Sequence, residues 1–335
     1  MSTTPIIARR DPALAAVVLR RRPLAYEDMT DGRSISTPVR SASSIVRTRH
    51  GLVIAQDDAN FIAFYNEDGT PSRAFALPPG EGGHRHFDER RGKKEHKLDL
   101  EGAVAVTGER GETLLQFGSG STPRRESVAI LGRVEPNPEV SLVHAPALFD
   151  ALRRETGFAG SELNIEGAIQ VGDRVRLFNR GNASRRGEGK PVNASCDLPV
   201  RALLAYLADP TNAPPPPANV VQYQLGELDG VALGFTDVTM RGDALYYAAA
   251  AEDSPDVVRD GPVPGSAIGV IERDGARWAP FTNADGSVFA AKVEGLVPVH
   301  EEPDTFFVVV DSDSPDAQSD LCTVELRGPW SATAQ

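Results

Sequence analysis

Three glutamates stand in nearly the same local sequence at widely separated points of the chain. Glu101 lies in Asp-Leu-Glu-Gly-Ala-Val, Glu166 in Asn-Ile-Glu-Gly-Ala-Ile, and Glu294 in Lys-Val-Glu-Gly-Leu-Val. Two weaker copies of the stretch place Ser43 and Thr236 at the corresponding position. If the copies come together, these side chains form a ring of oxygen atoms. Carboxylates at such close quarters cannot all stay ionised without a compensating charge.

A hard cation would provide this charge. Ca²⁺ is the best match because it accepts a mixed set of carboxylate, hydroxyl, carbonyl and water oxygens, whereas Mg²⁺ demands strict octahedral geometry. We therefore expect a Ca²⁺ site whose ligands come from Ser43, Glu101, Glu166, Thr236 and Glu294. The alternative is a water-filled channel in which arginine or lysine side chains from neighbouring repeats pair with the carboxylates.

Other polar residues follow or precede the apolar runs of the repeats and are candidates for catalysis. The candidate general bases are Asp57, Asp99, His96 and Asp311. Arginine forks suit phosphate and carboxylate groups, so Arg124, Arg125 and Arg180, together with Asn179, are candidate binders of a small anionic substrate. The sequence contains no Gly-x-Ser-x-Gly elbow, no His-Glu-x-x-His and no glycine-rich phosphate loop. The expected catalysis is therefore metal-centred.

Repetition of one structural unit would bring these residues together. Each copy of the repeated stretch starts an apolar run, which a turn, a second apolar run and a polar cluster follow, and successive copies are about 58 to 70 residues apart. Long periods of this kind are typical of β-propellers. Strand alternation would then direct the five corresponding side chains to one end of a central channel. We predict an all-β, five-bladed β-propeller; a six-bladed ring with an extra unit in Leu198–Leu228 is the alternative.

The chain ends are expected to close this ring. Only three strand-like runs follow Glu294, so the apolar segment Ala15–Leu19 is predicted to supply the missing strand of the last blade. We expect a single propeller domain over residues 1–335, with short tails at 1–12 and 328–335. A helix is predicted in Pro146–Thr156 from its apolar spacing, with Gly157 ending it.

Composition limits the partners. The net charge of −12 disfavours nucleic acids and anionic membranes. Cys196 and Cys322, the only two cysteines, have no paired spacing and are expected to be free thiols. The first apolar run ends in three arginines, which is the wrong polarity for a signal peptide, and no run reaches membrane-spanning length. We expect a cytoplasmic protein; no feature indicates a protein partner.

The repeated Glu-Gly stretches resemble those of phytase-like, esterase-like propellers and of a related group of uncharacterised bacterial propellers. The turn Phe117–Arg125 is similar to a recurrent feature of that uncharacterised group. The likeness covers most of the chain. The order Ser43, Glu101, Glu166, Thr236, Glu294 is also similar to the calcium-activated nucleotidase (apyrase) family, a five-bladed propeller whose central Ca²⁺ is held by a Ser, Glu, Glu, Ser, Glu series. The sequence departs from that family at Thr236 and around each glutamate, so the resemblance implies fold and metal rather than substrate.

Three functions are compatible with these features. The first is metal-dependent hydrolysis of a phosphoester or another anionic ester at the channel mouth. The second is a noncatalytic binding or scaffold propeller in which the cation only ties the blades together. The third is a lactonase-like calcium esterase, which needs a His or Asp base beside an open metal position.

Overall fold

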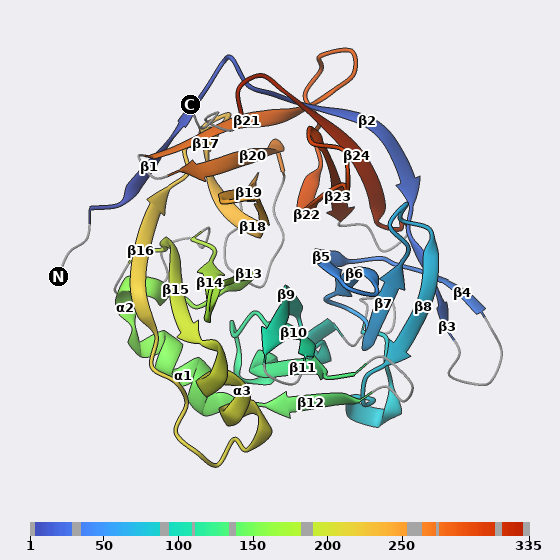
Figure 1. The fold of residues 1–335 in the computed structure, drawn as a ribbon, viewed down its shortest axis with the longest axis vertical. Helices are drawn as coiled ribbons and strands as arrows, with labels where there is room; N and C mark the ends of the chain where they lie inside the picture. The colour runs from blue at the N-terminus through green and yellow to red at the C-terminus, as the bar shows by residue number, and fades with distance from the viewer. Residues whose placement is uncertain are drawn as a thin grey trace.

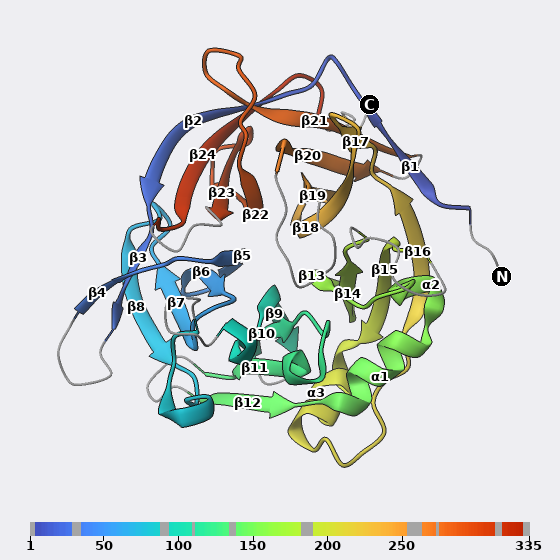
Figure 2. The ribbon, with the colours of Figure 1, turned by 180° about the vertical axis from the view of Figure 1, so that it is seen from behind.

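The computed structural model describes residues 4–28, 35–87, 94–108, 111–133, 139–181, 190–252, 263–272, 275–311 and 317–330. Most of these residues lie in antiparallel strands, and the strands form units arranged radially around a central axis (Figures 1 and 2). Short connections join the first two strands of each unit, and this is why the sequence shows paired apolar runs separated by turn residues.

Each unit is a meander of four strands that runs outward from the axis. The first contains β5 (Ala42–Thr48), β6 (Gly51–Gln56), β7 (Phe61–Tyr65) and β8 (Pro71–Ala76); the second contains β9 (Leu100–Gly108), β10 (Gly111–Gly118), β11 (Ser127–Leu131) and β12 (Val140–His144). The third contains β13 (Ile165–Val171), β14 (Arg174–Asn179), β15 (Asn193–Pro199) and β16 (Ala218–Gln224). The fourth contains β18 (Val231–Arg241), β19 (Ala244–Ala251), β20 (Gly265–Glu272) and β21 (Gly275–Asn283), with the short β17 (Glu227–Leu228) paired to β18.

The last unit draws on both ends of the chain. Strands β22 (Lys292–Pro298), β23 (Thr305–Asp311) and β24 (Asp320–Arg327) are joined by β2 (Ala15–Pro23), which pairs antiparallel with β24. The N-terminal strand therefore completes the final unit, as the sequence predicted. The exposed outer part of β2 carries Arg20 and Arg21 and a bulge at Leu19, features that protect an edge strand from pairing with other chains.

The innermost strands pack against one another in a closed order, from β5 to β9, β13, β18, β22 and back to β5 (Figure 1). Apolar side chains fill the space between neighbouring units. Each of five hydrophobic clusters joins two adjacent units, for example Phe64 with Leu114 between the first and second, and Phe307 with Ile45 between the last and first. Burial of these facing sheets holds the ring together.

The N-terminal segment is more ordered than expected. We expected a tail over residues 1–12, but Ile6–Arg10 forms β1, which pairs in parallel with β16 and with β21. Together β1 and β2 join three units into one continuous hydrogen-bonded sheet. The hairpin of β3 (Ala25–Asp28) and β4 (Ile35–Pro38) continues this belt beside β8. At the other end, the buried Trp330 donates to the Ala15 carbonyl at 3.2 Å, so residues 328–330 are also packed.

Helices are few and lie outside the ring. The predicted helix is present as α1 (Pro146–Arg154), followed by α2 (Thr156–Ala159), and α3 (Val200–Ala208) follows β15. Short 3₁₀ turns occur at Glu81–Gly83, Lys94–His96 and Pro123–Arg125. The region Leu198–Leu228, where an extra unit was considered, forms the end of β15, α3, outer strand β16 and β17. No helix within the described ranges is long and apolar enough to cross a membrane.

Candidate functional site at the channel mouth

All five inner strands carry a β-bulge at the residue that the sequence repeat singles out. On β9, Leu100 pairs with Gly118 and Gly102 pairs with Phe117, which leaves Glu101 as the extra residue. The same irregularity occurs at each corresponding position: Ser43 on β5, Glu166 on β13, Thr236 on β18 and Glu294 on β22. A bulge bends the strand and redirects the side chain of the extra residue. The repeated sequence therefore encodes a repeated backbone feature at one end of the inner strands.

The glycine after each glutamate lets the inner strands approach closely. A Cβ on Gly295 would lie 2.7 Å from the backbone nitrogen of Ile45, and one on Gly102 would lie 3.2 Å from the backbone of Gly167. A Cβ on Gly167 would lie 3.0 Å from the Val238 side chain. The pair Glu-Gly thus combines a mouth-facing polar group with close contact between neighbouring units.

The two hydroxyl members of the predicted ring tie neighbouring units together. Ser43 Oγ donates to the Leu100 carbonyl at 2.5 Å, and Thr236 Oγ1 donates to the Val293 carbonyl at 2.6 Å. Both side chains are buried. Their hydroxyl protons are used in these contacts, and only the oxygen lone pairs remain to meet a cation.

On one side of the mouth, a lysine and an arginine surround Asp99. Lys97 Nζ lies 2.7 Å from Asp99 Oδ1 and also contacts Asp57. Arg125 Nη1 lies 2.8 Å from Asp99 Oδ2, which also accepts a 2.5 Å hydrogen bond from Ser119. Burial opposes ionisation of Asp99, but Lys97 and Arg125 outweigh it and lower the pKa of this carboxyl. Asp99 is therefore an anion at neutral pH.

Glu101 completes a group of three carboxylates with Asp57 and Asp99. One oxygen atom from each of the three lies within 4.8 Å of the others. Burial, followed by the negative charges of Asp99 and Glu166, raises the pKa of Glu101 well above its usual range. Two adjacent carboxylates, Asp99 and Glu101, thus have pKa values that their surroundings push in opposite directions.

On the other side of the mouth, two cations link three glutamates. Arg180 contacts Glu166 at 3.3 Å and Glu252 at 2.6 Å, and Lys292 contacts Glu294 at 2.7 Å and Glu252 at 3.6 Å. All five side chains are buried or nearly so. Burial raises the pKa of Glu166 to about 8, with Arg180 opposing the rise and Glu294 adding to it. Glu166 is therefore mostly protonated at neutral pH.

The described part of the mouth has more acids than bases. Its carboxyl groups are Asp57, Asp99, Glu101, Glu166, Glu252 and Glu294, and its cations are Lys97, Arg125, Arg180 and Lys292. Full ionisation would leave an excess of two negative charges. Either protons on carboxyls such as Glu101 and Glu166 or a divalent cation would balance this excess.

The remaining predicted residues have different surroundings. His96 and Arg124 lie together, with Arg124 Nη1 and His96 Nδ1 2.5 Å apart, and Arg124 is exposed. Asn179 is fully buried; its Oδ1 accepts from the Asn164 backbone at 2.7 Å and its Nδ2 donates to the Val192 carbonyl at 3.0 Å. Asp311, half-buried, pairs across strands with Lys292 at the end of β23. Asn179 thus supports the backbone, whereas Arg124 lies at the surface beside His96.

Two residues outside the predicted set hold the glutamates, and both occupy the first position of a repeated stretch. Asn164 Nδ2 donates to Glu166 Oε1 at 2.6 Å, and Lys292 Nζ contacts Glu294 Oε1 at 2.7 Å. Each lies two residues before its glutamate. Comparing that first position across the repeats could have identified them, because it holds Asp99, Asn164 and Lys292.

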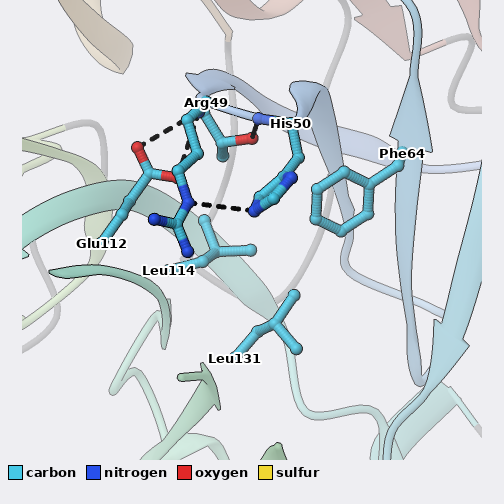
Figure 3. Close-up of a pocket in the computed structure, with 7 residues that line it drawn as sticks. Arg49, His50, Phe64, Glu112, Leu114 and Leu131 are labelled. Atoms are coloured by element: carbon cyan, nitrogen blue, oxygen red, sulfur yellow. Dashed lines mark hydrogen bonds between the residues drawn. The ribbon is translucent and has the colours of Figure 1, made fainter. Parts of the chain in front are cut away.

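A small pocket lies at the opposite end of the strands from the bulges. It is lined by Thr48, Arg49, His50, Phe64, Glu112, Leu114 and Leu131 (Figure 3). The Arg49 backbone donates to both carboxylate oxygens of Glu112, at 3.1 and 3.2 Å, and Arg49 Nε donates to His50 Nε2 at 3.0 Å. This pocket shares no residue with the channel mouth, and Glu112 provides a control position away from it.

Antiparallel units arranged radially around a central axis, with their inner strands packed in a closed order, define the protein as an all-β, propeller-class fold. Residues 38–326 match the model of a family of unknown function, DUF6929, and the chain belongs to that family. No curated protein matches the sequence. The resemblances to phytase-like and apyrase propellers therefore stay predictions.

Similar solved structures include propeller-like enzymes. Glutaminyl cyclase of Myxococcus xanthus has a TM-score of 0.49 at 9% sequence identity, and the match covers 97% of this chain and 99% of the cyclase chain. A GH43 β-1,3-galactosidase has a TM-score of 0.49 at 9% identity, covering 91% of this chain and 60% of its own. An exo-1,5-α-L-arabinanase from a bovine ruminal metagenomic library has a TM-score of 0.42 at 10% identity, covering 85% and 92%. We infer neither site nor substrate from these likenesses.

Proposed function

We propose that the chain is a five-bladed β-propeller whose channel mouth binds a divalent cation, with Ca²⁺ best suited, and hydrolyses a phosphoester or another anionic ester. The cation would be held by Asp57, Asp99 and Glu101. This set is chosen from the described residues because one oxygen atom of each lies within 4.8 Å of the others. In the predicted ring of five, Glu166 and Glu294 are engaged by Arg180 and Lys292.

The observation that carries the proposal is the convergence of three carboxylates from two separate parts of the chain. Asp57 follows β6, Asp99 precedes β9 and Glu101 forms the β9 bulge, yet their oxygens lie within 4.8 Å of one another. Oxygen atoms at such separations can share one Ca²⁺, which tolerates irregular ligand geometry.

The chain's own residues could support hydrolysis around such a cation. A bound cation would polarise an ester oxygen or activate water. Glu166, with a pKa of about 8, could donate a proton to the leaving group. Arg124 on the rim offers an exposed guanidinium to an anionic group.

Hydrolysis of model esters tests this proposal. The purified protein is assayed with bis(p-nitrophenyl) phosphate and with the neutral ester p-nitrophenyl acetate, after chelation and after Ca²⁺ or Mg²⁺ is added back. We expect Ca²⁺-dependent phosphodiester cleavage that Glu101→Gln reduces by about 100-fold or more, while Arg124→Ala raises KM. Glu112→Gln, on the opposite face, serves as the matched control. Cleavage that survives both chelation and Glu101→Gln would contradict the proposal.

A noncatalytic scaffold is the second candidate, and Lys97 favours it. Its ammonium contacts Asp57 and Asp99, so the protein carries a cation of its own at this position. A mouth that is fully satisfied by ion pairs would tie the blades together without a metal or a reaction. This alternative predicts no hydrolysis of either ester, no Ca²⁺ binding, and loss of stability in Lys97→Gln that Ca²⁺ does not restore.

A further inference from the structure

Lys97 stands where a cation bound to the carboxylate group would stand. Its Nζ lies 2.7 Å from Asp99 Oδ1 and contacts Asp57 Oδ2, and only 10% of its side chain is exposed. Two of the three proposed ligands thus already hold a positive charge that belongs to the chain. The two carboxylates bind a cation in this structure, and that cation is the ammonium of Lys97, which is covalently attached to the chain.

We infer that Lys97 is a displaceable internal cation, which competes with the divalent ion for Asp57 and Asp99 and thereby sets the affinity and selectivity of the site. The inference rests on the cation site proposed above. It adds a specificity-determining residue whose role is opposite to that of a ligand, because removing Lys97 should tighten cation binding.

The contacts of Asp99 show that the site would survive departure of the lysine. Lys97 uses Oδ1, whereas Arg125 and Ser119 hold Oδ2 at 2.8 and 2.5 Å. If the ammonium moves away, those two contacts still fix the carboxylate and leave Oδ1 directed at the vacated position. Arg125 is in turn held by Ser121 at 2.9 Å.

Asp57 is arranged similarly. Lys97 contacts its Oδ2, while Oδ1 has no hydrogen-bond partner within the part of the chain that the structure describes. A cation that replaces the ammonium could therefore use both oxygens of Asp57. The lysine side chain, a flexible four-carbon stem with a point charge, can withdraw without moving the backbone.

Tethering predicts which ions can compete. An ammonium attached to the same chain has a high effective concentration at the site, so Na⁺ or K⁺, with the same single charge, gains nothing by replacing it. A divalent ion brings one further positive charge to a cluster in which carboxyl groups outnumber cations. The mouth should therefore discriminate by charge and exclude monovalent ions.

Calorimetric Ca²⁺ titration of the full chain tests the inference, with Lys97→Gln compared with Lys292→Gln. Both variants remove one positive charge from the mouth, but Lys292 contacts Glu252 and Glu294 instead of the proposed ligands. We expect Lys97→Gln to bind Ca²⁺ about tenfold more tightly than wild type, and Lys292→Gln to gain less than about threefold. An equal increase of Ca²⁺ affinity in both variants, or no increase of Ca²⁺ affinity in Lys97→Gln, would overturn the inference.

Thermal unfolding covers the case in which Lys97→Gln is too unstable to titrate. If Ca²⁺ takes the place of the ammonium, it should raise the melting midpoint of Lys97→Gln more than that of wild type, and K⁺ should not. Failure of Ca²⁺ to restore the fold of this variant would refute displacement. If wild type binds Ca²⁺ and Lys97→Gln binds it no more tightly, only this inference is overturned. If neither wild type nor any variant binds Ca²⁺, the proposed cation site itself is overturned.

Discussion

The Ser43 hydroxyl on β5 donates a 2.5 Å hydrogen bond to the Leu100 carbonyl on β9, the inner strand of the next unit. Thr236 on β18 makes the same contact with Val293 on β22 at 2.6 Å. In both cases the donor is the bulged residue of its strand, and the acceptor directly precedes the next bulged glutamate. The non-acidic members of the repeat thus join units, and the acidic members project into the mouth.

Removing these hydroxyls should weaken the fold and leave cation binding unchanged. We expect Ser43→Ala and Thr236→Val each to lower the free energy of unfolding by about 1–3 kcal/mol, because a buried carbonyl loses its partner. Urea unfolding measures this loss, and a Ca²⁺ titration of the same variants should match wild type. Loss of Ca²⁺ affinity without loss of stability would instead assign the hydroxyls to the cation.

Alanine at the bulge glycines should destabilise the ring in a graded order. Gly295→Ala should cost most, about 3 kcal/mol or more, because the new Cβ would meet the Ile45 backbone at 2.7 Å. Gly102→Ala, with its nearest contact at 3.2 Å, should cost less. Gly132→Ala, whose Cβ would make only an ordinary 3.7 Å contact, is the control. Equal unfolding midpoints for Gly295→Ala and Gly132→Ala would show that the inner strands do not pack as closely as described.

Glu166 should make stability fall as the pH rises. Its pKa is about 8 in the folded protein against 4.5 for the ordinary side chain, so between these values the folded state holds a proton that the unfolded chain releases. The free energy of unfolding should therefore decline across this window, with a slope approaching about 1.4 kcal/mol per pH unit for one such group. Glu101, whose pKa is also raised, acts in the same direction.

Urea unfolding between pH 5 and pH 8 with a chelator present measures this slope. Glu166→Gln cannot titrate and should flatten the profile. Asp99 acts in the opposite sense, because its pKa is lowered from the ordinary value of 3.8. Its contribution to the free energy of unfolding is present at neutral pH and is lost only when the pH falls into stronger acid. A wild-type profile that is flat or rising above pH 5, or one that Glu166→Gln leaves unchanged, would contradict the assigned protonation.

The parts of the fold that repeat could be predicted from sequence, because one local pattern recurs with one backbone role. Glu101, Glu166 and Glu294 mark inner strands, and the missing fourth strand after Glu294 indicated that Ala15–Leu19 completes the last unit. Strand β1 could not be found in this way. Its parallel pairing with β16 and β21 joins residues more than 200 positions apart and leaves no periodic signal.

Most residues of the candidate site could be predicted from the sequence, but the ion pairs between them could not. Sequence repetition placed the glutamates at one mouth, yet it could not show that Lys97 would lie between Asp57 and Asp99 or that Arg180 would reach Glu252. Long charged side chains form ion pairs with residues of other units, and which residues they reach depends on the geometry of loops outside the repeat. The proposed ligand set is therefore the group of three neighbouring carboxylates and not the ring of five.

The most direct test of the account is equilibrium dialysis of Ca²⁺ against the chelator-treated protein, comparing wild type with Glu101→Gln and Glu294→Gln. A cation site formed by Asp57, Asp99 and Glu101 predicts one bound Ca²⁺ per chain in wild type, loss of that ion in Glu101→Gln, and retention in Glu294→Gln, since Lys292 rather than a metal engages Glu294. Folded wild type that binds no Ca²⁺, or equal loss in the two variants, would contradict a cation site formed by Asp57, Asp99 and Glu101.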